Sequence, residues 1–333
     1  MNRRSLLIGA GALAFSSAAF AQDVSFDFQA AAAYSRPRRG VSLLVMQRGR
    51  VLFEDYPEPG GPDRAWELAS GTKSFTGVIA AAAVQDGILE LDELAADTLT
   101  EWRNDPLKRR ITIHNLLSLN SGLQAGGIGR PPTYAAAIQT PSVAPPGERF
   151  AYSPAPFQAF GEIMRRKLTR DADPLAYLQR RVLTPIGIAP AEWRRGSDGM
   201  PFLPQGAHLT ARDWATFGQF VEEGGRGLVD QRALAQCFTP SPTNPGYGMS
   251  WWLLRHGLIP PAPGAGVNEA DFAGLEALGP VSMAAGAGDQ RLYLIPSHGI
   301  VIVRQANEIL RSMMMRRGEQ WSDGAFLRAL FRL

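Results

Sequence analysis

The chain has 333 residues, of which 45% are apolar and 20% charged, and its formal net charge is +3. This composition is typical of a globular protein with enough apolar material for a large core or two packed lobes. The single cysteine, Cys237, excludes an internal disulfide and a cysteine-rich metal site, and we expect it to be a small core residue. The four histidines have no partner at metal-ligand spacing, so no metal is expected. The basic residues form no stripe with interleaved aromatics, so no nucleic-acid partner is expected.

Residues 1–21 have the pattern of an export signal. Arg3 and Arg4 precede an apolar run over residues 6–15, and residues 19–21 read as a small-x-small cleavage site. The arginine pair also resembles a twin-arginine signal; ordinary secretion stays the alternative, because this chain writes almost every basic residue as arginine. No cysteine follows the apolar run and no later stretch is long and apolar enough to span a bilayer, so we predict a periplasmic or secreted protein without a membrane anchor.

The first elements of the mature chain are a hairpin and a helix. After a lead-in over residues 22–40, two β-rich runs at 41–46 and 51–56 flank a turn signal at 47–50. An apolar, alanine-rich stretch then predicts a helix over residues 71–85.

The centre of the chain has a different pattern from its two ends. Residues 88–244 have mostly helical patterns broken by loops rich in proline and glycine. After residue 245 the pattern changes to that of strands, and a helix closes the chain; the strands are expected at 247–254, 281–285, 290–295 and 300–304, and the helix at 321–331. We therefore predict an α/β fold in which an antiparallel sheet flanked by helices is built from residues 22–87 and 245–333, with residues 88–244 inserted as a mostly helical lobe.

Ser70 and Lys73 form the most informative motif of the chain. Of 34 basic residues only three are lysines, and Lys73 lies in front of an apolar run. Residues i and i+3 share a helix face, so the two side chains can meet if the helix begins near Ser70. A desolvated lysine can lose its proton near neutral pH, as arginine cannot, and can then act as a base for the serine. The alternative is a serine that precedes a lysine by chance.

Tyr152 is a second candidate. It lies at the entry of a predicted helix over residues 157–168, where Ser153 can cap the helix and Pro154 can occupy its first position. At such a place a phenol can relay a proton to a leaving group. Packing of the ring beneath the loop is the alternative function of this residue.

These motifs together resemble the serine β-lactamase/penicillin-recognising superfamily. The likeness is to its class C-like branch, which includes esterases, D-amino-peptide hydrolases and 6-aminohexanoate-dimer hydrolases, and it spans roughly residues 40–310. It rests on the S-x-x-K motif of Ser70 and Lys73, on the segment ending in Tyr152-Ser153 and on the order of further segments, at 111–123, 209–218, 247–252 and 284–296. The resemblance implies a β-lactamase/transpeptidase-like fold.

The resemblance also implies a role for each site residue. Ser70 would be the nucleophile, Lys73 the base and Tyr152 the proton shuttle of a hydrolase that forms an acyl-Ser70 intermediate without a cofactor. The oxyanion would lie between the N–H of Ser70 and an N–H within the segment Gly288, Asp289 and Gln290, with Gln290 favoured. The partner would be a small ester or amide; the oligomeric state stays open.

The chain departs from the family pattern at two positions. Pro154 stands where an asparagine often holds the lysine, and Asp289 lies in a motif that lacks the usual cation for a substrate carboxylate. A neutral or cationic ester or amide is therefore expected rather than an anionic penicillin-like substrate. A true β-lactamase or D,D-peptidase is one alternative, and a catalytically decayed binding module is another.

Overall fold

The computed structural model describes residues 24–262, 267, 272, 274–309 and 321–333. The predicted export signal lies outside these residues. Among them, six strands form one antiparallel sheet in the order β2-β1-β9-β8-β7-β6. The strands of this sheet are β1 (Gly40–Gln47), β2 (Arg50–Asp55), β6 (Trp252–Leu254), β7 (Val281–Gly286), β8 (Gln290–Ile295) and β9 (Ile300–Ala306).

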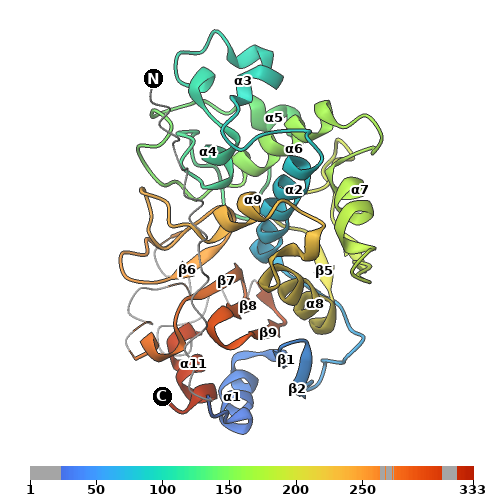
Figure 1. Cartoon of the computed structure of the whole chain (residues 1–333), viewed down its shortest axis with the longest axis vertical. Coiled ribbons are helices and arrows are strands. Elements are labelled where there is room, and N and C mark those ends of the chain that lie inside the picture. Colours follow the sequence, from blue (N-terminus) through green and yellow to red (C-terminus); the bar gives the residue numbers. More distant parts are fainter. Residues whose placement is uncertain (1–23, 263–266, 268–271, 273, 310–320) are drawn as a thin grey trace, which may run out of the picture.

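The two ends of the chain meet in this sheet. β1 pairs with β9, with Leu44 opposite Val303, so the first hairpin joins the last three strands (Figure 1). Both strands are almost wholly buried, which explains their apolar sequences. The predicted antiparallel sheet is thereby confirmed.

Helices cover both faces of the sheet. Gly218 of helix α8 (Ala211–Glu222) packs against Leu292 and Leu294 of β8, because a Cβ atom there would lie 2.8 and 3.3 Å from their side chains. The alternate residues of β8, Arg291 and Tyr293, bond Asp323 of helix α11 (Asp323–Phe331) instead. Since successive side chains of a strand point to opposite faces, α8 and α11 lie on opposite faces. Helix α1 (Phe28–Ser35) packs beside α11.

The other α-helices of the described residues lie in the sequence between β2 and β6. They are α2 (Lys73–Gln85), α3 (Ala95–Thr98), α4 (Ile113–Leu117), α5 (Tyr134–Gln139), α6 (Ala155–Lys167), α7 (Pro174–Leu178) and α9 (Gln231–Ala235). A small sheet that the sequence did not predict joins β3 (Trp66–Glu67), β5 (Ala207–Leu209) and β4 (Glu192–Trp193). The predicted domain boundaries stay a prediction.

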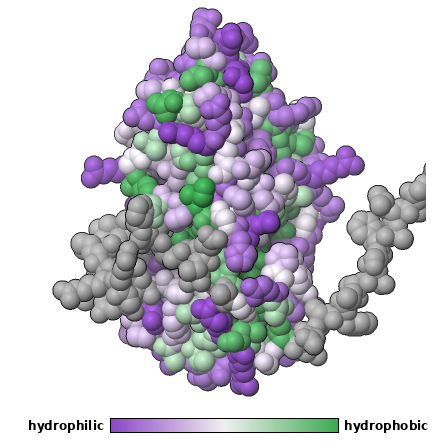
Figure 2. Space-filling view, turned by 90° about the vertical axis from the view of Figure 1, so that its left-hand side faces the viewer, coloured by the Kyte–Doolittle hydropathy of each residue, from purple (hydrophilic) through white to green (hydrophobic). Residues whose placement is uncertain are grey.

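Some predicted bounds differ from the structure. Only Trp252–Leu254 of the predicted strand 247–254 joins the sheet, because the preceding residues form turns and Ser250 has φ 71°. The predicted helix at 71–85 begins as a 3-10 turn over Ala69–Thr72 that continues into α2. No helix of the described ranges is long and apolar enough to cross a membrane. On the face seen in Figure 2, hydrophobic residues form separate patches between hydrophilic ones.

Candidate active site

The turn that carries Ser70 is held from two sides. Leu68 donates its N–H to Ala207 O of β5 at 2.9 Å, and Ala207 donates to the Thr72 hydroxyl at 3.2 Å. Ala69 has φ 46°, which a residue with a side chain rarely adopts and which the surrounding contacts must enforce. Ser70 thus sits at a rigid corner between β3 and α2, and its side chain is half-buried.

Lys73 is the first residue of α2 and is in contact with Ser70. Its Nζ lies 3.1 Å from Ser70 Oγ and donates to Pro204 O at 3.0 Å. The side chain is buried, and the rings of Tyr152 and Phe157 lie 4.7 and 5.5 Å from Nζ. Burial lowers the pKa of Lys73 from 10.5 to about 7. Near neutral pH, a large fraction of the protein molecules therefore has Lys73 in its neutral form, which can accept the Ser70 proton.

Tyr152 joins the same group. Burial raises the pKa of Tyr152 to about 12, and a hydrogen bond with Ser70 opposes part of this rise. Its ring stacks on Trp252 of β6, with 5.6 Å between centroids. The structure therefore brings Ser70, Lys73 and Tyr152 together, and at neutral pH the phenol carries its proton.

The segment after Tyr152 differs in detail from the prediction. Helix α6 begins at Ala155, and Pro154 is its N-cap residue rather than its first turn. The Ser153 hydroxyl accepts from the N–H of Ala155 at 3.4 Å and from that of Gly126 at 3.2 Å. Ser153 therefore ties the glycine-containing loop at 124–130 to the segment that carries Tyr152.

The carbonyl of Pro204 holds the lysine in this chain. Sequence reasoning missed this residue, because a main-chain oxygen about 130 positions away leaves no signal in the sequence. The segment is fixed by Gln158 of α6, whose Oε1 accepts from Leu203 N at 3.0 Å, and by Thr76 of α2, which donates to Leu203 O at 3.4 Å. Gln158 and Thr76 thus hold in place the segment whose carbonyl accepts from Lys73.

The end of β7 approaches the nucleophile turn at Gly286. A Cβ atom on Gly286 would lie 2.1 Å from Leu68 O and 3.1 Å from Gly71 N, so only glycine fits here. In the described part of the chain, no acceptor is found for the backbone N–H of Ser70 or for that of Ala287. Ser70 lies between Leu68 and Gly71, the two residues that Gly286 approaches, and Ala287 directly follows Gly286 in the chain.

Gly288, Asp289 and Gln290 have other partners in the structure. The Gln290 side chain is fully buried and bonds both backbone groups of Ala306, and Asp289 O accepts from Arg304 at 2.8 Å. The Asp289 carboxylate lies 3.6 Å from Arg39. The negative charge of Asp289 is therefore balanced by a positive charge within the protein. The predicted oxyanion role of the segment stays a prediction that these contacts do not favour.

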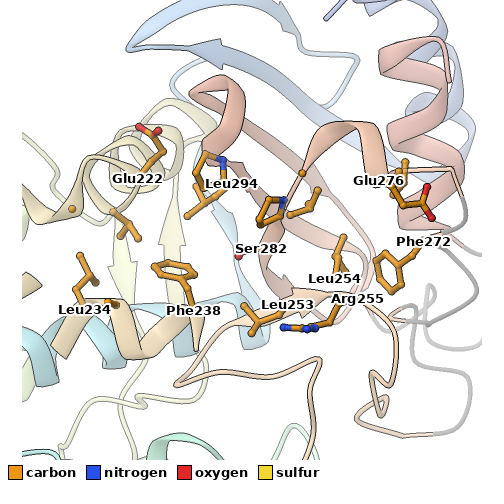
Figure 3. Close-up of a pocket in the computed structure, with 18 of the residues that line it drawn as sticks. Glu222, Leu234, Phe238, Leu253, Leu254, Arg255, Phe272, Glu276, Ser282 and Leu294 are labelled. Atoms are coloured by element: carbon orange, nitrogen blue, oxygen red, sulfur yellow. The ribbon is translucent and has the colours of Figure 1, made fainter. Parts of the chain in front are cut away.

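An apolar cavity lies elsewhere in the described part of the molecule. It has a volume of about 720 Å³ between α8, α9, β6 and β7, and Leu234, Phe238, Leu253 and Leu254 belong to its wall (Figure 3). Ser70, Lys73 and Tyr152 do not line it. We place the chemistry at Ser70 because its hydroxyl oxygen lies 3.1 Å from the buried amine of Lys73. Cys237, as predicted, is a buried core residue, and burial raises the pKa of its thiol.

The chain is similar to known proteins over most of its length. The model of the Beta-lactamase family matches residues 22–310. None of the curated proteins compared with the chain matches it. Among solved structures, the chain is similar to a candidate 6-aminohexanoate-dimer hydrolase from Bacillus anthracis, with 19% identity, a TM-score of 0.60 and coverage of 84% of this chain and 77% of the other.

Two further structures cover most of both chains. EstCE1, a hydrolase with promiscuous acyltransferase activity, has 15% identity and a TM-score of 0.67, with 91% of this chain and 96% of the other covered. A D-stereospecific amidohydrolase from Streptomyces sp. has 15% identity and a TM-score of 0.66, with 92% and 98% covered. At these identities the structures show a shared fold, and the resemblance found in the sequence is confirmed at that level.

Proposed function

The chain belongs to the beta-lactamase family and is a serine hydrolase of that family, and on this premise we propose that it cleaves an ester or amide through an acyl-Ser70 intermediate. The observation that carries the proposal is the contact between Lys73 Nζ and Ser70 Oγ, at 3.1 Å, with the lysine buried and its pKa lowered to about 7. A buried amine in this state is a base for the hydroxyl one turn earlier.

The acylation step follows from the arrangement. Neutral Lys73 accepts the Ser70 proton while Oγ forms a bond to the substrate carbonyl carbon, and the carbonyl oxygen takes the negative charge. Tyr152 is protonated because its pKa is about 12, and it donates this proton to the leaving group as the bond between the leaving group and the carbonyl carbon breaks. Tyr152 then regains the proton that Lys73 accepted from Ser70. The products are an acyl-Ser70 ester and the free alcohol or amine. Water then releases the acid and restores the serine.

We assign the oxyanion hole to the backbone N–H groups of Ser70 and Ala287. Both lack an acceptor within the described residues, and Gly286 brings the end of β7 against the Ser70 turn. Two such donors stabilise a tetrahedral intermediate, and the loss of one costs about 10²–10³ in rate. This assignment replaces Gln290 of the sequence prediction.

The substrate class follows from the end of β7. Residues 283–287 supply no side-chain charge next to the proposed oxyanion hole. A substrate carboxylate would find no cation on this strand, so a neutral or cationic small ester or amide is the proposed partner. The names of the similar structures, a hydrolase with acyltransferase activity and an amidohydrolase, support this class.

A fluorophosphonate probe tests the proposal. The probe should label the wild-type protein and leave the matched variant Ser70→Ala unlabelled, and Ser70→Ala should also lose hydrolysis of p-nitrophenyl esters. A folded wild-type protein that is neither labelled nor hydrolytic would favour the decayed binding module. Rapid turnover of a chromogenic cephalosporin, at a rate equal to that of a neutral ester, would favour the β-lactamase or D,D-peptidase alternative.

We also propose that the protein is exported through its first 21 residues. The support is the arginine pair, the apolar run and the cleavage-site pattern of the sequence. Fractionation of a bacterial host should find the protein in the periplasm or medium. Replacement of both Arg3 and Arg4 by lysine should block export if the twin-arginine route is used, and should leave it intact if the ordinary secretory route is used.

A further inference from the structure

One peptide group contains the proposed oxyanion donor of β7. The carbonyl of Gly286 and the N–H of Ala287 belong to the same planar unit, in which the two bonds point in opposite directions. Whatever fixes the direction of the carbonyl therefore fixes the direction of the N–H. In the structure, Arg291 Nη1 donates to Gly286 O at 3.2 Å and to Gln290 O at 3.1 Å.

The position of Arg291 determines which way the peptide group is turned. Arg291 lies on the face of the sheet that α11 covers, since its guanidinium bonds Asp323. Bonding to it draws the Gly286 carbonyl toward that face. The Ala287 N–H is thereby turned to the other face, where Gly286 meets Leu68 and Gly71 beside the nucleophile.

The guanidinium is itself held in a fixed orientation. Asp323 accepts from Arg291 Nε at 2.7 Å and from Nη2 at 3.4 Å, and both side chains are at most 2% exposed. Asp323 also accepts from Trp321 Nε1 at 2.9 Å and from the Tyr293 hydroxyl. The cost of removing two charges from water largely offsets the attraction within a buried ion pair, so such a pair adds little net stability. The function that we consider for this pair is therefore the orientation of a neighbouring group.

We propose that Arg291, oriented by Asp323, is a positioning residue of the oxyanion hole: it clamps the Gly286 carbonyl so that the Ala287 N–H faces the reacting carbonyl. A charged donor on the carbonyl also polarises the peptide group, which makes its N–H a stronger donor. This inference rests on the proposed function, because it concerns the acyl transfer at Ser70.

Paired oxygen and sulfur substrates test the inference. A p-nitrophenyl ester places an oxyanion in the hole, whereas the matched thionoester, with C=S in place of C=O, develops charge on a larger atom that accepts hydrogen bonds weakly. Loss of the positioned N–H therefore slows the ester and largely spares the thionoester. A general loss of structure slows both alike, so the ratio of the two kcat/KM values separates positioning from folding.

The variants are Arg291→Lys and Asp323→Asn, with Arg304→Lys as the matched control. Arg304 is as buried as Arg291 and bonds the same turn, but it donates to Gly288 O and Asp289 O rather than to the Gly286 carbonyl. We expect Arg291→Lys to lower kcat/KM for the ester about 10²-fold and the ester/thionoester ratio at least about 10-fold. Asp323→Asn should shift the ratio in the same direction, and Arg304→Lys should leave it unchanged.

Each outcome decides the question. An unchanged ratio in Arg291→Lys and Asp323→Asn, with Ser70-dependent turnover intact, would overturn this inference and leave the proposed function standing. An equal shift in Arg304→Lys would also overturn it. If Arg291→Lys does not fold, Asp323→Asn, which keeps the guanidinium, gives the result. Wild-type protein without Ser70-dependent turnover would overturn the proposed function and this inference with it.

Discussion

At the scale of single residues, the site depends on two side chains whose pKa values move in opposite directions from one cause. Burial lowers the pKa of Lys73 to about 7 because it disfavours the cation, and raises the pKa of Tyr152 to about 12 because it disfavours the phenolate. At neutral pH one group can accept a proton and the other can donate one. This is the combination that acid–base catalysis of acyl transfer needs.

The pH dependence of acylation should follow Lys73. The neutral fraction of the amine grows as the pH rises through about 7, so the rate should increase with pH around a midpoint near 7 and then level off. Tyr152 keeps its proton until the pH approaches about 12, so no decline from this group is expected in the weakly alkaline range. The measurement is the pH profile of kcat/KM for an ester.

Lys73→Arg is the matched variant, since it keeps the charge but cannot act as a base at neutral pH. We expect it to lower kcat/KM by about 10²–10⁴. Turnover near that of the wild type would refute the role of Lys73.

Tyr152→Phe separates proton transfer from packing. The variant keeps the ring that stacks on Trp252 and removes only the hydroxyl. Acylation should fall about 10²–10⁴-fold while the melting temperature stays nearly unchanged. Stopped-flow acylation and a thermal melt measure the two quantities; a large loss of thermal stability with little loss of rate would instead support a packing role.

At the scale of elements, the proposed oxyanion hole depends on how closely β7 approaches the turn before α2. Gly286 makes this approach possible, since a side chain there would meet Leu68 O, a main-chain atom that cannot move without moving Ser70. β7 and α2 are about 200 residues apart in the sequence, so only the folded chain brings them together.

Gly286→Ala should therefore separate the two elements. We expect a fall of kcat/KM of about 10² or more, because one oxyanion donor leaves its place, with a loss of stability of about 1–3 kcal/mol from overpacking. Gly127→Ala is the control, because a Cβ atom at Gly127 meets nothing within 4 Å. If both variants keep wild-type kcat/KM, the close approach has no catalytic importance.

At the scale of the whole molecule, the last helix is joined to the strands next to the proposed site. Helix α11 supplies Asp323, the partner of buried Arg291, and packs against α1, where Asp27 donates to Leu330 O at 2.7 Å. Both ends of the described chain are thus joined to the sheet that carries β7.

Removal of residues 321–333 should therefore destabilise the entire protein. Loss of one member of a buried ion pair alone costs about 3–5 kcal/mol, and the apolar face of α11 is lost with it. Urea unfolding followed by circular dichroism measures the effect. Removal of only Arg332 and Leu333, which are exposed, is the control and should change little. A truncated chain with the unfolding midpoint of the full chain would contradict this account.

The sequence by itself determined what depends on neighbouring residues. The i, i+3 spacing placed Ser70 and Lys73 on one helix face, and the β-rich runs at the two ends of the chain predicted the strands that form the antiparallel sheet. The rarity of lysine in this chain pointed to Lys73. Segment order over most of the chain was enough to predict the fold of the beta-lactamase family.

Only the tertiary structure decided which groups complete the site. The Pro204 carbonyl that holds Lys73, the Arg39 partner of Asp289 and the Arg291 clamp on Gly286 are contacts of folded chain segments. Two of the three involve main-chain oxygens, which every residue possesses and which no sequence pattern marks. The depressed pKa of Lys73 has the same origin, because desolvation is produced by all the residues packed around an amine and not by those beside it in the chain.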